Sequence, residues 1–236
     1  MEKGGVNINY HNITYPDMNN GGGLRVVLWL SGCSHKCEGC QNPQTWDANS
    51  GILFDESAKE ELFRELDKDY ISGLTLSGGD PLFEGNLGDV LDLVTEVNKR
   101  YNTTRHIDEN NQNNHNILNT NADKIRLSSP QKSIWLYTGN TISTCKYFDD
   151  TIFTFQPSYY HPNPLNNKHV KVDEKAFLIK QDRKRIEIIK NVDVLVDGQY
   201  IDSLRDVTLP WCGSSNQKVI DIQQSLKKGE IVLWQT

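Results

Sequence analysis

The sequence predicts an α/β fold, a partial (β/α) barrel built from parallel strands. A short apolar strand, a turn and an amphipathic helix follow one another twice between residues 26 and 101, and two further strand-like runs come later in the chain. This alternation favours βαβ units, which place the loops that carry chemistry at the carboxyl ends of the strands. A group of cysteines and a Gly-Gly-Asp turn both follow predicted strands, so we expect them to lie close together.

The first unit joins a buried strand to a helix. Val26 to Leu30 is a short β-rich apolar run that ends just before the cysteines, as expected for a buried strand. From Glu56 to Leu66, charged residues are mixed with apolar residues at helical spacing, which predicts an amphipathic helix.

The second unit repeats this order. Leu74 to Leu76 predicts a strand, and Ser77 to Pro81 predicts a sharp turn. Leu87 to Tyr101 predicts a second helix, because its valines and leucines recur at helical spacing.

Later segments continue the barrel. Ser133 to Thr138 and Val192 to Val196 predict two more strands. Eight asparagines between Asn102 and Asn121, with few apolar residues, predict a mobile loop that cannot bury enough surface to order itself. We therefore expect a single domain over residues 1–236 with insertions at about 102–131 and 141–185.

Composition narrows the class of function. The formal net charge of −6, without a long basic run, argues against binding to nucleic acid or to an anionic membrane surface. The chain has no secretory signal and no apolar stretch long enough to cross a membrane, so we expect a soluble, cytoplasmic protein. Five cysteines, three of them within eight positions, indicate metal or redox chemistry instead of a disulfide framework.

The cysteine group has the spacing Cys33-x3-Cys37-x2-Cys40. Three thiolates leave one iron of a [4Fe–4S] cluster open to an external ligand, which is an arrangement suited to catalysis. Zinc is the alternative, with His35 or a distant cysteine as the fourth ligand. The spacing alone leaves both open.

The turn Ser77-Gly-Gly-Asp-Pro81 is the second candidate. Its glycines allow a ligand to approach the backbone, and Asp80 can accept a hydrogen bond from an ammonium group. The same residues also form ordinary β–α turns. Taken together with the cysteine loop, the turn favours a ligand site.

Both motifs together resemble the radical S-adenosylmethionine superfamily. Within it the chain is most similar to the activating enzymes of glycyl-radical enzymes, and among those to the activases of anaerobic (class III) ribonucleoside-triphosphate reductase. Eight segments in the same order carry the resemblance: 20–25, 31–35, 39–42, 45–46, 76–82, Trp135-x-Tyr-Thr-Gly139, Val196-Asp-Gly198 and Trp211-x-Gly-Ser-Ser-Asn-Gln217. The chain has Gln41 and Asn140 where the family usually has aromatic residues.

The resemblance implies a radical S-adenosylmethionine barrel and an oxidoreductase. A [4Fe–4S] cluster would be held by Cys33, Cys37 and Cys40, with its fourth iron chelated by the methionine end of S-adenosylmethionine. An electron from a low-potential donor such as flavodoxin or ferredoxin would cleave the cofactor to methionine and a 5′-deoxyadenosyl radical. That radical would take a hydrogen atom from a glycine of the reductase, the protein substrate.

The resemblance also implies the cofactor contacts. The amino group of S-adenosylmethionine would face Gly78, Gly79 and Asp80. The backbone of residues 39–41 (Gly39, Cys40 and Gln41) would lie along its adenosyl part. No catalytic residue is expected beyond these cluster and cofactor ligands.

Two other functions remain possible on the sequence. An activase of the pyruvate formate-lyase type, or the radical enzyme of deazapurine biosynthesis, would share the chemistry but typically carries Glu where Asp80 stands. A zinc-binding interaction module would use the cysteines for folding alone.

The remaining conspicuous residues have structural interpretations. Trp29 and Trp135 are expected in the core, because large aromatics dominate burial. His35 is interpreted as a hydrogen-bonding loop residue, and Arg25 as either part of an ion pair or a cofactor contact. Cys145 and Cys212 are interpreted as incidental thiols.

Overall fold

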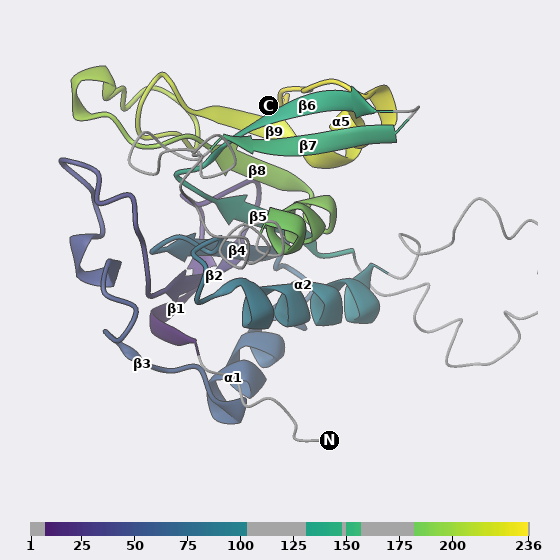
Figure 1. Ribbon diagram of the computed structural model, residues 1–236. Coiled ribbons are helices and arrows are strands. Elements are labelled where there is room, and N and C mark those ends of the chain that lie inside the picture. The colour runs from purple at the N-terminus through teal and green to yellow at the C-terminus, as the bar shows by residue number, and fades with distance from the viewer. Residues whose placement is uncertain (1–7, 103–130, 148–149, 157–181, 236) are drawn as a thin grey trace, which may run out of the picture.

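The fold is organised by a seven-stranded sheet with the strand order β3-β1-β2-β4-β5-β8-β9 (Figure 1). The computed structural model describes residues 8–102, 131–147, 150–156 and 182–235. The strands of this sheet are β1 (Asn9–Asp17), β2 (Arg25–Leu30), β3 (Ile52–Leu53), β4 (Gly73–Gly78), β5 (Ser133–Tyr137), β8 (Val194–Asp197) and β9 (Lys218–Asp221).

The centre of the sheet is parallel and its edges are antiparallel. The strands β2, β4, β5 and β8 pair in parallel in that order. Strands β1 and β3 close one edge and β9 the other, all in antiparallel pairing. The predicted α/β fold is confirmed as an open sheet that corresponds to a partial barrel.

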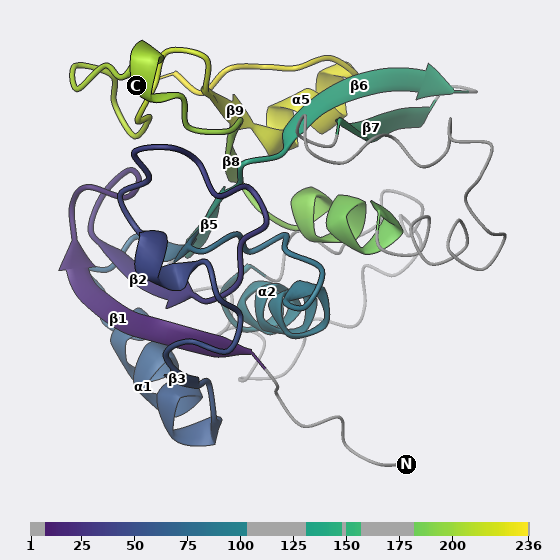
Figure 2. The same ribbon diagram turned by 60° about the vertical axis from the view of Figure 1, so that its left-hand side comes forward.

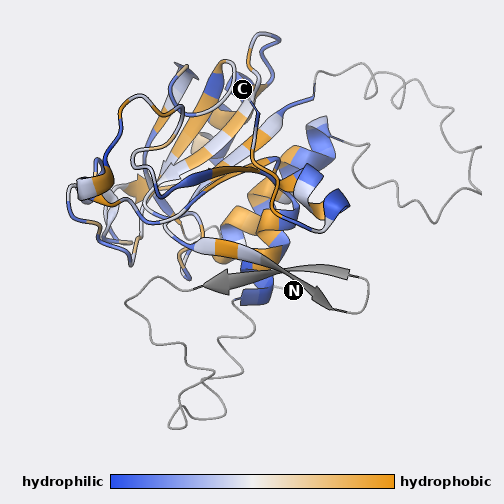
Figure 3. Cartoon of the chain, turned by 90° about the horizontal axis from the view of Figure 1, so that it is seen from above, coloured by the Kyte–Doolittle hydropathy of each residue, from blue (hydrophilic) through white to orange (hydrophobic). Residues whose placement is uncertain are grey.

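The helices α1 (Glu56–Leu66) and α2 (Leu87–Tyr101) have the bounds that the sequence predicts. The α1 helix begins after Asp55, whose carboxylate accepts a hydrogen bond from the backbone N–H of Ala58 and so satisfies one free donor of the first turn. Both helices combine hydrophobic and hydrophilic faces (Figure 3).

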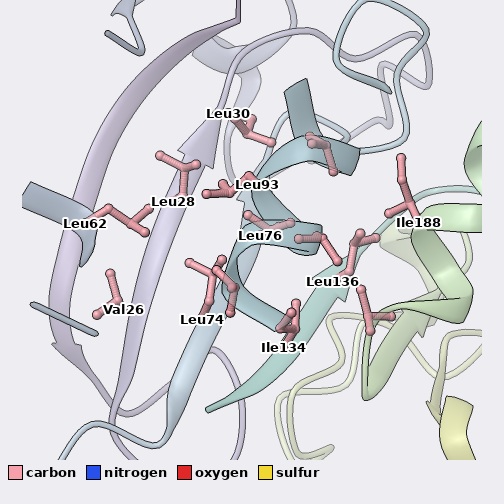
Figure 4. Packing of buried hydrophobic residues seen from close by; sticks show 14 of the residues in the cluster. Val26, Leu28, Leu30, Leu62, Leu74, Leu76, Leu93, Ile134, Leu136 and Ile188 are labelled. Atoms are coloured by element: carbon pink, nitrogen blue, oxygen red, sulfur yellow. The ribbon is translucent and has the colours of Figure 1, made fainter. Parts of the chain in front are cut away.

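The main core lies between one face of the sheet and these helices. Alternate residues of the central strands point into it because successive side chains of a strand face opposite sides (Figure 4). Residues 182–190 are also helical and add Ile188 and Ile189 to the same core. The core residues that the figure labels are Val26, Leu28, Leu30, Leu62, Leu74, Leu76, Leu93, Ile134, Leu136 and Ile188.

The opposite face of the sheet carries a buried arginine. Arg25 is 0 % exposed and donates hydrogen bonds to the hydroxyls of Thr75 (3.0 Å) and Ser133 (2.7 Å) and to the carbonyls of Leu74 and Ser133. Its guanidinium also lies 5.7 Å from the ring centre of Trp135. Arg25 therefore binds neutral oxygens at the amino ends of the strands, and the expected ion pair is not formed within the described residues.

Of the two tryptophans expected in the core, Trp29 and Trp135, only one is buried. Trp135 is 1 % exposed and packs edge-on against Trp211 and Trp234, as a core residue should. Trp29 stays partly exposed, and its indole N–H donates to Thr14 Oγ1 at 2.9 Å. The expected core position therefore holds for Trp135 only.

The two predicted insertions fall largely outside the described residues. That is the case for residues 103–130, which include the asparagine-rich stretch, and for residues 157–181. The second predicted insertion begins with an antiparallel hairpin of β6 (Thr141–Tyr147) and β7 (Asp150–Gln156). In the described part of the chain, no helix is long and apolar enough to span a membrane.

Candidate functional site

The loops that follow β2, β4, β5 and β8 meet at one end of the sheet. The loop after β2 and the loop after β8 lie beside each other there in both ribbon views (Figures 1 and 2). A cavity of about 460 Å³ lies between the four loops. Its walls include the following predicted site residues: Cys33, Cys37, Cys40, Gln41, Gly78, Gly79 and Asp80. Gly39 is the one predicted site residue that does not line it.

The cysteine loop presents three free, half-buried thiols. Burial raises the pKa of the Cys33 thiol to about 12, with a further contribution from the charge of Asp80, although backbone hydrogen bonds from His35 and Lys36 partly oppose the rise. Burial also raises the pKa of Cys37. Thiolates at these positions therefore need a cation, such as iron, to stabilise them.

The path of the loop between these cysteines is strained. Lys36 has a φ of +46°, a left-handed conformation that costs a residue with a side chain about 1–2 kcal/mol. No three His, Cys, Asp or Glu side chains in the described ranges converge on one metal-ion position.

The Gly-Gly-Asp turn is docked on the start of the cysteine loop. The N–H of Gly79 donates to the carbonyl of Leu30 at 2.7 Å, and that of Asp80 to the carbonyl of Gly32 at 2.8 Å. A Cβ on Gly79 would lie 2.5 Å from the carbonyl oxygen of Gly32. Glycine is required at 79 because the two turns touch there.

The Asp80 side chain joins the loops to one another. Its Oδ1 atom accepts from the N–H of Leu82 at 2.8 Å, and the side chain is 3 % exposed. Its Oδ2 atom accepts hydrogen bonds from His35 Nε2 (2.7 Å), Thr138 Oγ1 (3.0 Å), Gly139 N (3.3 Å) and Asn140 Nδ2 (3.2 Å).

These contacts decide the charge of Asp80. Burial by itself raises the pKa of its carboxyl. The hydrogen bond and charge of His35, together with hydrogen bonds from the Leu82 backbone and the Thr138 hydroxyl, outweigh burial and hold the pKa below its usual value. Asp80 is therefore ionised at neutral pH. The structure also explains Asn140, where the family usually has an aromatic residue, because its amide binds both Asp80 and Thr138.

The loop after β8 closes the other side of the site. Gln199 donates from Nε2 to the carbonyl of His35 at 3.3 Å. Gly39 packs against Asp202, since a Cβ on Gly39 would lie 2.6 Å from the Asp202 carboxylate. Sequence reasoning missed Gln199 and Asp202, although the motif Val196-Asp-Gly198 comes directly before them.

Two buried donors have no partner in the described part of the chain. They are the indole N–H of Trp46 and the hydroxyl of Tyr137, and both residues line the 460 Å³ cavity. Burial is the largest cause that raises the pKa of the Tyr137 phenol, so its hydroxyl stays protonated. A buried donor without a partner costs about 1–3 kcal/mol, which a ligand with acceptor oxygens would recover.

A larger open cavity adjoins the first. It has a volume of about 1510 Å³ and shares Cys33, His35, Trp46 and Tyr200 with the smaller one. The two cavities therefore border each other at the cysteine loop.

Comparison with known proteins gives consistent matches. Residues 19–118 and 164–220 match the family model described as a 4Fe-4S single cluster domain. Three of the similar curated proteins are each named anaerobic ribonucleoside-triphosphate reductase-activating protein. The protein of Enterobacteria phage T4 is 34% identical over 90% of this chain and 93% of its own length. The protein of Escherichia coli strain K12 is 30% identical over 90% and 97%, and that of Haemophilus influenzae is 31% identical over 86% and 92%.

Proposed function

Since the chain belongs to the family of anaerobic ribonucleoside-triphosphate reductase-activating proteins, we propose that it generates the glycyl radical of such a reductase. It is a radical S-adenosylmethionine oxidoreductase that uses a [4Fe–4S] cluster. The observation that carries the proposal is the meeting of the cysteine loop and the Gly-Gly-Asp turn at one cavity.

We assign the cluster to Cys33, Cys37 and Cys40. The donor set fits an iron–sulfur cluster, because three thiols in one loop border the same cavity and leave one iron for another ligand. The hydrogen bonds that the thiols receive from the protein also suit thiolates, for example those to Cys37 from the Gln199 side chain and the Tyr200 backbone.

We assign S-adenosylmethionine to the remaining space of the 460 Å³ cavity. Its amino group would face Gly78, Gly79 and the ionised Asp80, whose carboxylate attracts an ammonium group. The backbone of residues 39–41 would lie along the adenosyl part. The unpaired donors of Trp46 and Tyr137 suit the carboxylate and hydroxyl oxygens of this cofactor.

The protein's own residues bind and orient, whereas the bound groups supply the chemistry. With both groups in place, one electron cleaves S-adenosylmethionine reductively and a hydrogen atom is removed from a glycine of the reductase. The electron would come from a low-potential donor such as flavodoxin or ferredoxin. We propose that a segment of the reductase approaches the site through the adjoining 1510 Å³ cavity.

The test is glycyl-radical formation on the cognate anaerobic reductase. The full-length protein, reconstituted anaerobically with iron and sulfide, is mixed with reductant, S-adenosylmethionine and the reductase, and the radical is measured by electron paramagnetic resonance (EPR). We expect a radical signal with this reductase and none with pyruvate formate-lyase. Radical formation on pyruvate formate-lyase alone would overturn the assignment of the partner.

A further inference from the structure

His35 lies where the four loops of the site meet. Its side chain is 4 % exposed, and its Nε2 atom is 2.7 Å from Asp80 in the loop after β4. Its imidazole packs on Gly139 in the loop after β5, and its carbonyl accepts from Gln199 in the loop after β8. His35 itself belongs to the loop after β2, so this one residue connects all four.

Because His35 lies within the cysteine loop, its contacts also hold the backbone between two of the cysteines. His35 stands between Cys33 and Cys37, and its backbone N–H is one of the donors to the Cys33 thiol. The next residue, Lys36, has the left-handed φ of +46°. An anchored imidazole holds the backbone in this path, and without the anchor the short segment between the two thiols is free to relax.

We propose that His35 is a positioning residue that acts through Asp80 and fixes Cys33 and Cys37 where they would hold the cluster beside the S-adenosylmethionine space. This inference rests on the proposed function. His35 is not a ligand in this account, because its Nε2 atom is directed at the Asp80 carboxylate. Asp80, Gly139 and Gln199 are all loop residues outside the hydrophobic core, so loss of the anchor should disturb the site and leave the fold intact.

Two variants with the same amide group but different side-chain lengths test whether residue 35 must reach Asp80. In His35→Gln the amide nitrogen can occupy roughly the place of Nε2 and still donate to Asp80. In His35→Asn the side chain is one methylene shorter and cannot reach it. Both full-length variants are reconstituted anaerobically, and the change that S-adenosylmethionine causes in the EPR signal of the reduced cluster is titrated.

For His35→Gln we expect the cofactor concentration at half of the EPR change to lie within about twofold of the wild-type value. For His35→Asn we expect this concentration to be about tenfold higher, or the EPR change to be absent, because a hydrogen bond to a charged group is lost. Near-ultraviolet circular dichroism should be the same for both variants.

Different results of this titration would overturn the role of His35 or the proposed function. A wild-type titration for His35→Asn, or equal impairment of the two variants, would overturn it. If wild-type protein itself shows no cofactor-dependent signal, the proposed function fails instead, so the two failures are distinguishable. Should His35→Asn not fold, Gly139→Ala displaces the imidazole from the other side, and a wild-type titration for that variant would equally refute the role of His35.

Discussion

Gly139 lies directly against the imidazole of His35: a Cβ on residue 139 would be 2.5 Å from the His35 Cδ2 atom. Gly139 also donates its backbone N–H to the carboxylate of Asp80 at 3.3 Å. The glycine of the Tyr-Thr-Gly motif is thus explained by a contact with the cysteine loop, which stands more than a hundred residues earlier in the chain.

We expect Gly139→Ala to push the imidazole off Asp80. Overpacking of this kind costs about 1–3 kcal/mol of stability, and the affinity for S-adenosylmethionine should fall about tenfold. Gly22→Ala is the matched control, because a Cβ there would be 3.6 Å from Trp135, an ordinary contact. Cofactor binding to the two reconstituted variants checks this, and equal affinities would show that the contact does not matter.

Asp80→Asn tests the carboxylate. The amide retains one oxygen but turns an N–H₂ group toward the Leu82 N–H or toward the donors on Oδ2, and it has no charge to attract an ammonium group. We expect the affinity for S-adenosylmethionine to fall about tenfold or more, with iron content close to wild type because the cysteines are unchanged. A binding titration with the wild-type affinity would refute the assignment of Asp80 to the cofactor.

Arg25→Lys should affect stability and not cofactor binding. Lysine cannot reproduce the forked set of donors that satisfies Thr75, Leu74 and Ser133, so we expect the free energy of unfolding to fall by about 2–4 kcal/mol. Urea unfolding of the protein measures this change. Arg25 is not among the residues that line the cavity, and a large loss of cofactor affinity without destabilisation would contradict its structural role.

The stretch 103–129 should be dispensable for cofactor cleavage. The chain on its two sides is joined by the Asn102 side chain, which accepts from the N–H of Lys132 at 3.1 Å and donates to its carbonyl at 2.9 Å. A short Gly-Ser linker therefore has only a small gap to close, and loop closure entropy changes by only about 0.6 kcal/mol per doubling of length. We expect normal reductive cleavage with a chemical reductant; a folded, cluster-containing variant that no longer cleaves the cofactor would place this stretch in the site.

Much of the central fold could be predicted because it depends on local patterns. The strand β2 and the helices α1 and α2 follow from apolar runs and helical spacing, and their predicted bounds agree with the structure to within a residue. The strand β1 was not predicted. Its pairing with β2 is irregular between Tyr10 and Asn12, which breaks the alternation that marks a strand in sequence.

The residues of the site could be predicted from the sequence, but the contacts between its loops could not. The cysteine loop and Asp80 are recognisable because their motifs are short and contiguous. The bond between His35 and Asp80 joins residues 45 positions apart, and Gly139 and Gln199 lie farther still along the chain. Only the sheet brings these loops together, so the interpretation of His35 as a hydrogen-bonding residue is confirmed while its partner could not be named.

The most direct test of the account is 5′-deoxyadenosine formation by the anaerobically reconstituted protein and its cysteine variants, with dithionite as reductant. We predict product from the wild type and from Cys145→Ala and Cys212→Ala, and none from Cys33→Ala, Cys37→Ala or Cys40→Ala, because a cluster without one of its thiolates is labile. Iron and sulfide should be present in the active proteins. A colourless wild-type protein with one zinc per chain and no product, or a Cys212→Ala variant as inactive as the loop variants, would contradict the account.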